Sequence, residues 1–240
     1  MSATVNPGML EELSKASLFE GVSADIVQTF LNSGSRFVYG AGTPIIIIND
    51  TGETFFLILG GIAKITLLND KNDAVNVTLF KTGDFFGELS LLEARPTRTA
   101  NVIAASEVEV LAIQRPQFMK LMHQHPDLAL NMAKVLGQRI RAMNDRMLTL
   151  TLPDLHRVAS TLLHLARQGK TFSEQGPVLL PNLPLKDWVL FCNSSQDKFM
   201  EIIEHMRNAG VLEWSNQRIV VKNLSLLSKL SKPDPSHYGE

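Results

Sequence analysis

The sequence predicts an α+β protein in which a jelly-roll-like β-roll is followed by a long helix and then by a winged helix-turn-helix. Three observations support this order of parts. Short apolar runs, broken by glycine and by Asn/Asp pairs, fill residues 37–113 and are typical of a compact all-β unit. Apolar residues then recur every three or four positions up to Leu150, within a helical zone that ends at Leu152. After Asp154, the pattern is that of helices followed by a hairpin.

The composition limits the class of protein. The 240 residues carry 23 Lys and Arg against 24 Asp and Glu, a formal charge of -1. The chain is therefore not basic overall, although a local basic face is compatible with this balance. The single cysteine, Cys192, excludes an intrachain disulfide framework and a CxxC zinc site. Because no apolar run has signal-peptide or membrane-spanning length, we expect a cytoplasmic protein without a membrane partner.

We place the first domain at residues 1–115 and expect a β-roll preceded by two short helices. The helices are expected at 9–18 and 24–31, where they would pack on the roll. The strands are expected in the apolar runs at 45–48, 55–59, 62–68, 75–80, 102–105 and 108–113.

Residues 116–152 are predicted to form a dimerisation helix. Pro126–Asp127 is a favourable helix start, and the apolar residues that follow alternate steps of three and four, the spacing of a coiled-coil seam. The alternative is that this stripe packs on the chain's own core. Charged residues surround the stripe and leave little apolar surface for a second contact, so we expect a homodimer. The seam consists of Ala133, Leu136, Ile140, Met143, Met147 and Leu150.

Residues 153–222 are predicted to form a winged helix-turn-helix domain, and residues 223–240 a C-terminal tail. An amphipathic helix starts at Asp154 and ends near Gly169, before a Gly/Pro-rich loop at 176–184. Two short helices and a hairpin follow, which is the order of a DNA-binding module with a β wing. The helices are expected at 185–191 and 195–209, and the hairpin strands at 211–214 and 218–221.

The segment from Gly83 to Leu92, followed by Arg98 and Thr99, is the candidate ligand site. A guanidinium can meet both exocyclic oxygens of a cyclic phosphodiester, which suits Arg98, and Thr99 adds a hydroxyl donor. The N–H groups near Glu88 point at the same phosphate if a helical turn starts there. Ionised Glu88 would accept a hydrogen bond from a ribose 2′-hydroxyl. The alternative is an ion pair between Glu88 and Arg98 that braces the loop.

This motif and the order of the parts resemble the cyclic AMP receptor protein / fumarate and nitrate reductase regulator (CRP/FNR) family, over about residues 18–222. The spacing from Gly87 to Arg98 is similar to that of the family's phosphate-binding cassette. The resemblance implies a cyclic-nucleotide-responsive, homodimeric transcription regulator in which ligand binding in the β-roll alters DNA binding. The ligand-binding residues that it implies are Gly87, Glu88, Leu89, Ser90, Arg98, Thr99, Met143 and Asn144.

The resemblance implies cyclic AMP as the first choice of effector, but the base that is read stays open. Cyclic AMP responders of this family read adenine with a Thr-Ser pair, where this chain has Met143 and Asn144. The carboxamide of Asn144 can still bond N6 and N7 of adenine. Groups that recognise guanine are also present on this helix, so cyclic di-GMP and cyclic GMP are alternatives. They are Arg139, Arg141, Asp145 and Arg146, for which a solvated charged face is the other interpretation.

The helix that would read DNA departs from the family pattern. DNA-binding relatives have Ser-Arg-Glu-Thr-Val-x-Arg, whereas this helix carries Glu201 in place of the second arginine. A carboxylate near DNA phosphates lowers affinity. The alternative function is therefore a cyclic nucleotide or cyclic di-GMP receptor that acts through a protein partner, such as RNA polymerase or another regulator. The DNA-binding residues implied by the resemblance are Ser195, Gln196, Asp197, Lys198 and Glu201. Because no catalytic constellation or metal-ligand spacing is present, we expect neither an enzyme nor a metal site.

Overall fold

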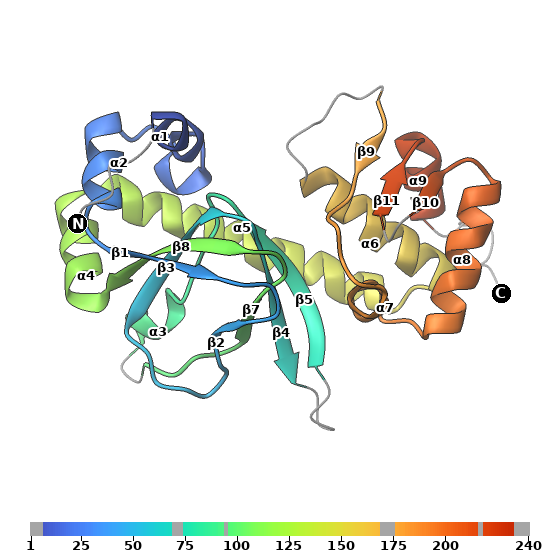
Figure 1. The fold of residues 1–240 in the computed structure, drawn as a ribbon, viewed down its shortest axis with the longest axis horizontal. Coiled ribbons are helices and arrows are strands. Elements are labelled where there is room, and N and C mark those ends of the chain that lie inside the picture. Colours follow the sequence, from blue (N-terminus) through green and yellow to red (C-terminus); the bar gives the residue numbers. More distant parts are fainter. Residues whose placement is uncertain (1–6, 69–73, 94–95, 169–175, 216–217, 233–240) are drawn as a thin grey trace. The chain divides into compact units, whose positions relative to one another are not determined.

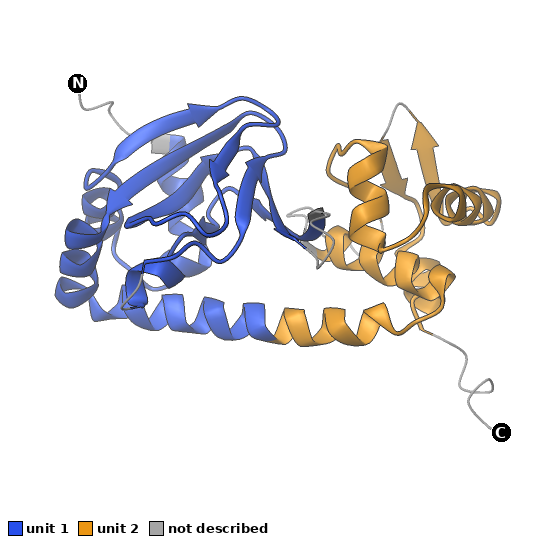
Figure 2. Ribbon diagram, turned by 90° about the horizontal axis from the view of Figure 1, so that it is seen from below, with its two compact units in different colours: residues 1–140 blue, residues 141–240 orange. Residues whose placement is uncertain are grey.

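The computed structural model describes residues 7–68, 74–93, 96–168, 176–215 and 218–232. The predicted turns within 69–73, the predicted helix end near Gly169 and the hairpin tip at Asn216–Gln217 lie outside these residues. The chain forms two compact units, residues 1–140 and 141–240, which have different colours in Figure 2.

Two antiparallel sheets build the roll of the first unit (Figure 1). One sheet has the strand order β1-β8-β3-β6, and the other has the order β2-β7-β4-β5. All six predicted strands are present, whereas β1 and the two-residue β6 were not predicted. The strands are β1 Ser35–Tyr39, β2 Pro44–Ile46, β3 Thr54–Gly60, β4 Ile62–Leu68, β5 Ala74–Lys81, β6 Phe85–Phe86, β7 Asn101–Ala104 and β8 Val108–Gln114.

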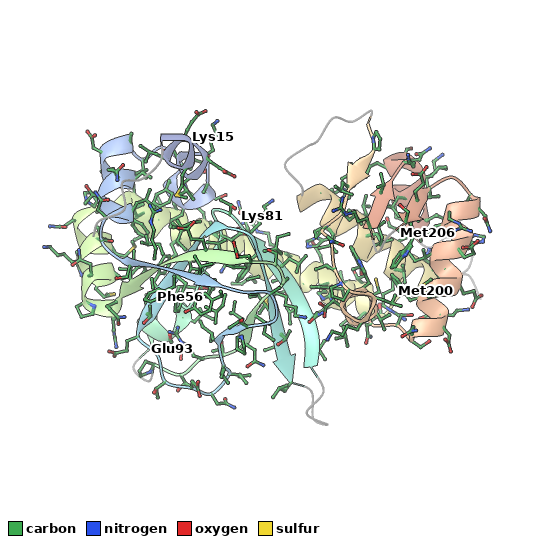
Figure 3. All side chains as sticks on the ribbon, viewed as in Figure 1. Lys15, Phe56, Lys81, Glu93, Met200 and Met206 are labelled. Carbon is green, nitrogen blue, oxygen red and sulfur yellow. The ribbon has the colours of Figure 1, made fainter. Side chains whose placement is uncertain are left out.

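Strand β3 is apolar without interruption because both of its faces are covered. Phe55, Leu57 and Leu59 belong to the cluster between the roll and the helices. Phe56 and Ile58, which point the other way, belong to the cluster inside the roll. Figure 3 labels Phe56 among the side chains of the roll. A continuous apolar run is what a strand buried on both faces requires.

The helices of the first unit cover one side of the roll. The prediction of a helix over 9–18 is wrong in its second half, because Ala16 is extended (φ −71°, ψ 146°) and ends the helical path. This break turns Leu18 and Phe19 into the core, where each is at most 1% exposed. The helices are α1 Pro7–Ser14, the 3-10 turn η1 Ser17–Phe19, α2 Ala24–Leu31, α3 Leu89–Leu92, α4 Arg115–Gln124 and α5 Pro126–Leu150.

A buried amide attaches α5 to η1 and to the residue that follows it. The side chain of Asn131, on α5, is 3% exposed. Its Nδ2 donates hydrogen bonds to the carbonyl oxygens of Leu18, at 3.2 Å, and Glu20, at 2.8 Å. The carboxamide oxygen accepts from Lys134 Nζ at 3.3 Å. Both ends of the buried amide therefore have partners, which removes the cost of its desolvation.

The predicted seam lies on the exposed face of α5. Ile140 is 60% exposed, Met143 55%, Met147 68% and Leu150 44%. The stripe is therefore not covered by the core of its own chain at these positions. A row of large apolar side chains exposed along one helix is a feature of interaction surfaces.

The second unit combines four helices with a small antiparallel sheet of order β10-β11-β9. The prediction of a loop over 176–184 is wrong at Val178, which pairs with Val221 and is 4% exposed. Its strand has only two residues, too few for a period to be recognised. The elements are α6 Asp154–Gln168, β9 Val178–Leu179, α7 Leu185–Cys192, α8 Gln196–Asn208, β10 Leu212–Ser215, β11 Arg218–Val221 and α9 Leu224–Leu230.

The end of the described chain is helical where only a tail was expected. Asn223 caps α9, because its Oδ1 accepts a hydrogen bond from the backbone N–H of Leu226 at 2.9 Å. Leu227 is fully buried. The carbonyl oxygen of Leu230 lies 2.9 Å from His156 Nδ1 on α6. These contacts make α9 part of the second unit.

Helix α8 has one buried and one exposed face, as predicted for the second helix of the motif. Phe199, Ile202, Ile203 and Met206 are all at most 5% exposed. Met200 is 38% exposed, and Figure 3 labels it together with Met206 on this helix. The helix therefore presents its polar residues to solvent while its apolar stripe forms part of the core.

Candidate functional site

The side chain of Arg98 is buried in the first unit although it carries a permanent charge. It is 7% exposed. The strand-like segment around it is fixed by two backbone hydrogen bonds, from Arg98 N to Asp50 O at 2.8 Å and from Asn49 N to Arg98 O at 2.9 Å. The segment is thus held by its backbone, and the guanidinium points into the loop that precedes α3.

Three acceptors hold the guanidinium of Arg98. Nη1 donates to the carbonyl oxygen of Gly87 at 3.1 Å and to Oγ of Ser90 at 2.8 Å. Nη2 donates to the carbonyl oxygen of Thr54 at 3.0 Å. A guanidinium has five N–H donors, so Nε–H and one Nη2–H are left without an acceptor among the residues that the structure describes. These two lie on one edge of the group, which is the geometry for bidentate recognition of a phosphate.

Two glycines make room for this side chain. A Cβ on Gly52 would lie 2.4 Å from Arg98 Nε and 2.5 Å from Nη2. A Cβ on Gly87 would lie 2.7 Å from both Arg98 Nη1 and the carbonyl oxygen of Thr54. Gly87 also has φ +81°, a conformation that other residues rarely adopt. Gly87 was predicted as a site residue, whereas Gly52 and Thr54 were not.

The charge of Arg98 is not neutralised by an ion pair with any carboxylate in the described part of the chain. Burial lowers the pKa of Arg98 from its ordinary value, and the charge of Glu88 opposes this shift. Buried charges in proteins are as a rule paired. A buried guanidinium with two such N–H groups on the edge that faces Gly52 is therefore suited to an anion.

Glu88 pairs with Arg139 rather than with Arg98. Arg139 Nη1 lies 3.2 Å from Glu88 Oε1, and Nη2 donates to the carbonyl oxygen of Phe85 at 2.7 Å. The guanidinium carbon also lies 4.4 Å from the ring centroid of Phe80 and 4.5 Å from that of Phe85. The expected alternative of a Glu88–Arg98 brace is thus wrong. Glu88 and Arg98 are close enough in the sequence for a contact. In the structure, however, the carboxylate of Glu88 points toward Arg139 on α5.

Burial disfavours the charged forms of both Glu88 and Arg139. Burial raises the pKa of Glu88, and the neighbouring cations Arg139 and Arg98 oppose the shift without cancelling it. Burial likewise lowers the pKa of Arg139, against the charges of Glu88 and Asp84. A hydroxyl that donates a hydrogen bond to Glu88 would favour its ionised form.

A helical turn starts beside Arg98, as the motif predicted. Helix α3 begins at Leu89, and Glu88 is its N-cap residue. Ser90 is 2% exposed, and its hydroxyl donates to the carbonyl oxygen of Gly87 at 3.0 Å while accepting from Arg98. Leu89 is 42% exposed, and Thr99 is exposed as well. The cassette therefore brings together Gly87, Glu88, Ser90 and Arg98 and leaves Leu89 and Thr99 at the surface.

The other predicted ligand residues belong to the second unit. Met143 and Asn144 lie on α5 and are exposed there. Among the candidate guanine readers, Arg141 and Asp145 are exposed. Arg146 is not a solvated surface residue, because its Nη2 donates to the carbonyl oxygen of Phe191 at 2.8 Å. Arg139 is likewise committed to Glu88, as described above.

The predicted DNA-reading residues lie at the start of α8. Ser195 is its N-cap, and Ser195 Oγ accepts from the backbone N–H of Lys198 at 3.3 Å. Gln196, Asp197, Lys198 and Glu201 are exposed. Lys198 Nζ lies 2.9 Å from Glu201 Oε2, so the lysine of this helix start is paired with a carboxylate of the same helix.

Sequence reasoning missed the partner of Glu88, because Arg139 lies 51 positions away. It also missed Gly52, which leaves room for the Arg98 guanidinium because it has no side chain. No group of side chains suited to a metal ion occurs among the residues searched, which are those that the structure describes. In the same part of the chain, no helix is long and apolar enough to cross a membrane.

Known proteins share both the sequence pattern and the fold. The family model described as "Cyclic nucleotide-binding domain" matches residues 36–125. The Cyclic AMP receptor protein of Thermus thermophilus is 26% identical over 215 residues, which are 89% of this chain and 96% of that protein.

Two solved structures show the same fold at lower identity. FixK2 from Bradyrhizobium japonicum has a TM-score of 0.72 and 20% identity, covering 84% of this chain and 98% of its own. The c-di-GMP responsive global regulator CLP from Xanthomonas campestris has a TM-score of 0.71 and 18% identity, covering 84% of this chain and all of its own, 100%. Residues 36–125 therefore match the cyclic nucleotide-binding domain family, the chain is similar to a Cyclic AMP receptor protein over most of its length, and its fold is that of the two solved structures.

Proposed function

We propose that this protein is a homodimeric transcription regulator that responds to a cyclic nucleotide. The observation that carries the proposal is Arg98, a buried cation with two N–H donors left on one edge. A cyclic 3′,5′-phosphodiester presents two exocyclic oxygens and one negative charge, which match that edge in number, geometry and sign. The effector therefore binds in the first unit.

The cassette assigns a role to each group around this phosphate. The first backbone N–H groups of α3 and the hydroxyl of Thr99 add donors, and ionised Glu88 accepts from the ribose 2′-hydroxyl. Met143 and Asn144, or their counterparts in the partner subunit, contact the base. Cyclic AMP is the first candidate, since the Thermus thermophilus relative is a Cyclic AMP receptor protein. Cyclic GMP and cyclic di-GMP are the alternatives.

The exposed seam of α5 supports the homodimer. Four large apolar side chains between Ile140 and Leu150 are 44–68% exposed in the single chain. Their alternating spacing of three and four lets two copies of α5 pack against each other. Each chain would then supply its α5 to a two-fold interface.

The second unit carries the DNA-binding function of the regulator. Residues 141–240 carry 12 Lys and Arg against 10 Asp and Glu, whereas residues 1–140 carry 11 against 14. The exposed start of α8 reads DNA bases in the major groove, in the cytoplasm, and the protein controls transcription by RNA polymerase rather than catalysing a reaction. Ligand binding acts by favouring one of two arrangements of the dimer, as it must in any population shift.

Calorimetry on the full chain tests the input. Cyclic AMP, cyclic GMP and cyclic di-GMP are titrated into the wild type and into Arg98→Ala, with Arg36→Ala as the matched control, since Arg36 pairs with Glu109 on the same unit. We expect one of the nucleotides to bind the wild type and the control, and Arg98→Ala to lose at least about tenfold of that affinity. Equal affinity for all three proteins would overturn the assignment of Arg98.

Electrophoretic mobility shift tests the output. A library of duplexes is incubated with the protein at low salt, with and without the nucleotide that binds. The proposal requires sequence-selective retention that depends on the nucleotide. Retention of no duplex under either condition would leave a nucleotide receptor without operator binding and contradict the assignment of α8.

A further inference from the structure

Helix α7 leads directly into the helix that reads DNA, and the two are joined by a tight turn. Asn193 ends α7 in the left-handed conformation, with φ 47° and ψ 53°. The backbone N–H of Asn193 donates to the carbonyl oxygen of Leu190 at 3.3 Å, and that of Ser194 to Val189 at 3.2 Å. Ser195 is then the N-cap of α8. The end of α7 therefore determines where α8 begins.

Two arginines take up the last two carbonyl oxygens of α7. Arg146 Nη2 donates to Phe191 O at 2.8 Å, and Arg157 Nε donates to Cys192 O at 3.1 Å. Together with the two bonds of the turn, these contacts satisfy all four carbonyl groups that have no partner within the helix. Both guanidinium groups also place positive charge at the negative end of the helix dipole.

The titratable groups whose charges interact with Arg146 include the Cys192 thiol and His164. Burial raises the pKa of the Cys192 thiol to about 12, so the thiol stays neutral. Burial lowers the pKa of His164, and the charge of Arg146 lowers it further. The carbonyl oxygen of Phe191 is a partner that holds this guanidinium at the end of α7.

The two arginines come from different helices. Arg157 is on α6, where it also donates to Leu152 O at 2.7 Å and pairs with Asp154. Arg146 is on α5, one turn before that helix ends at Leu150. Of the two arginines, Arg146 is the one that joins α5 to the end of α7.

Arg146 is also related to the candidate ligand site through the helix that carries it. Arg139 and Arg146 are seven residues apart on α5, which is two turns of helix or about 10.5 Å along its axis. Positions seven apart lie on nearly the same face of a helix. Arg139 holds Glu88 of the cassette, and Arg146 holds Phe191. Helix α5 thus includes one residue that contacts the cassette, in the first unit, and one that contacts Phe191, in the second.

We propose that Arg146 is a positioning residue that transmits movement of α5 to the turn before α8 and so sets the placement of the DNA-reading helix. The inference rests on the proposed function, in which a nucleotide at the cassette alters DNA binding. Arg146 touches neither ligand nor DNA in this account; it acts through Phe191 and the turn at Asn193.

The chain contains its own reporter for this step. Its two tryptophans, Trp188 on α7 and Trp214 on β10, both lie in the second unit, whereas Arg98 and Glu88 lie in the first. Replacement of Trp214 by Phe leaves Trp188 as the single fluorophore, three residues from Phe191. Its emission then changes on addition of cyclic nucleotide only if the binding event reaches α7.

The experiment compares three variants in the full chain carrying Trp214→Phe. Arg146→Gln removes the guanidinium, Arg146→Lys keeps one donor and the charge, and Arg157→Gln removes the other guanidinium from the same helix end. For each protein, nucleotide affinity is measured by calorimetry, the ligand-induced change of Trp188 emission by titration, and DNA affinity with and without ligand by fluorescence anisotropy.

We expect Arg146→Gln to keep its nucleotide affinity within about twofold while the ligand-dependent gain in DNA affinity falls by about 2- to 30-fold. The ligand-induced emission change should fall with it, and Arg146→Lys should restore part of both. Arg157→Gln should lower the unfolding midpoint by about as much as Arg146→Gln but keep the ligand-dependent gain. An equal loss of gain in both Gln variants would mean that the arginines only cap α7, and an undiminished gain in Arg146→Gln would overturn the proposal. If the wild type itself shows no ligand-dependent gain in DNA affinity, the result contradicts the proposed function and not only the role of Arg146.

Discussion

Glu88 and Arg139 are 51 residues apart in the sequence, and their Oε1 and Nη1 atoms lie 3.2 Å apart in the structure. The carboxylate is 6% exposed and the guanidinium 24%. Arg139 is held further by the carbonyl oxygen of Phe85 and by the rings of Phe80 and Phe85. The cassette is therefore tied to α5 by a contact that is largely removed from water.

The ionisation of Glu88 should make stability depend on pH. Because burial raises its pKa above 4.5, the folded protein binds more protons than the unfolded chain between 4.5 and the raised value. The associated stabilisation is present below pH 4.5 and is lost as the pH rises through the folded pKa. We expect the free energy of unfolding of the wild type, minus that of Glu88→Gln, to decrease from below pH 4.5 to neutrality. Urea unfolding at a series of pH values measures this difference.

The control for that series is Glu107→Gln, which removes an exposed carboxylate from the turn between β7 and β8. The same series of measurements on this variant gives the baseline against which the Glu88→Gln difference is read. A Glu88→Gln difference that grows as the pH rises would contradict the cause assigned here, since it would indicate that the ion pair with Arg139 outweighs burial.

Mutations can distinguish the two requirements at Gly87, which are a positive φ and room for the Arg98 guanidinium. Gly87→Ala combines the cost of a positive φ with a clash against Arg98, whereas Gly42 has φ +85° and nothing within 4 Å of a Cβ. Gly42→Ala should therefore lower stability by about 1–2 kcal/mol and leave nucleotide affinity unchanged. Gly87→Ala should in addition lower nucleotide affinity by about tenfold or more, as calorimetry would show. Equal affinities in the two variants would mean that Arg98 tolerates displacement.

Gly52 should affect the ligand site without any backbone strain. A Cβ there would approach the Arg98 guanidinium to 2.4 Å, whereas a Cβ on Gly60 would meet nothing within 4 Å. We expect Gly52→Ala to weaken nucleotide binding by about tenfold, because it displaces the two N–H groups assigned to the phosphate. Gly60→Ala should bind like the wild type. Unchanged binding by Gly52→Ala would indicate that these N–H groups do not contact the ligand.

The exposed seam of α5 predicts the oligomeric state. Ile140→Glu combined with Met147→Glu places carboxylates at two seam positions that are 60% and 68% exposed in the single chain. Two copies of α5 would then bring like charges together, so sedimentation equilibrium should detect a monomer. Gln138→Glu adds the same charge at another exposed position of α5 and should remain a dimer. A dimer in both proteins would place the interface elsewhere.

The carboxylate of Glu201 predicts the response of α8 to DNA. Glu201→Gln releases Lys198 from its ion pair, so one further phosphate contact becomes available. The slope of log affinity against log salt should then steepen by about 0.9, and Glu201→Arg should raise affinity more. Glu213→Gln releases Lys222 in the same way on the hairpin, outside α8. Fluorescence anisotropy at several salt concentrations measures these slopes. If both Gln variants change the slope equally, the contact with DNA does not depend on α8 more than on the hairpin.

Local patterns predicted the elements whose signal lies within the element. Strand β4 at Ile62–Leu68 and helix α2 at Ala24–Leu31 match their predicted ranges, because alternation and helical periodicity are properties of neighbouring residues. The cassette could be predicted from the sequence for the same reason, because Glu88, Ser90 and Arg98 lie within 11 residues of Gly87.

Contacts across long sequence separations were not predictable in this way. Arg139 had two interpretations from the sequence, a guanine-reading group and a solvated surface residue, and its contact with Glu88 depends on how α5 packs against the roll. Arg146 binds a backbone carbonyl, a partner that every residue of the chain offers and no sequence pattern marks. Gly52 contributes by having no side chain, so only the position of Arg98 shows why it is there.

The amide of Asn131 has a consequence for where the first unit can be cut. The family match begins at residue 36, yet the partners of this buried amide, Leu18 and Glu20, lie upstream of that point. A chain shortened to residue 36 would leave two buried N–H groups without acceptors and would expose the core face that Phe19 and Phe30 cover. The smallest fragment that folds should therefore include the residues that form α1, η1 and α2, although they lie outside the matched domain.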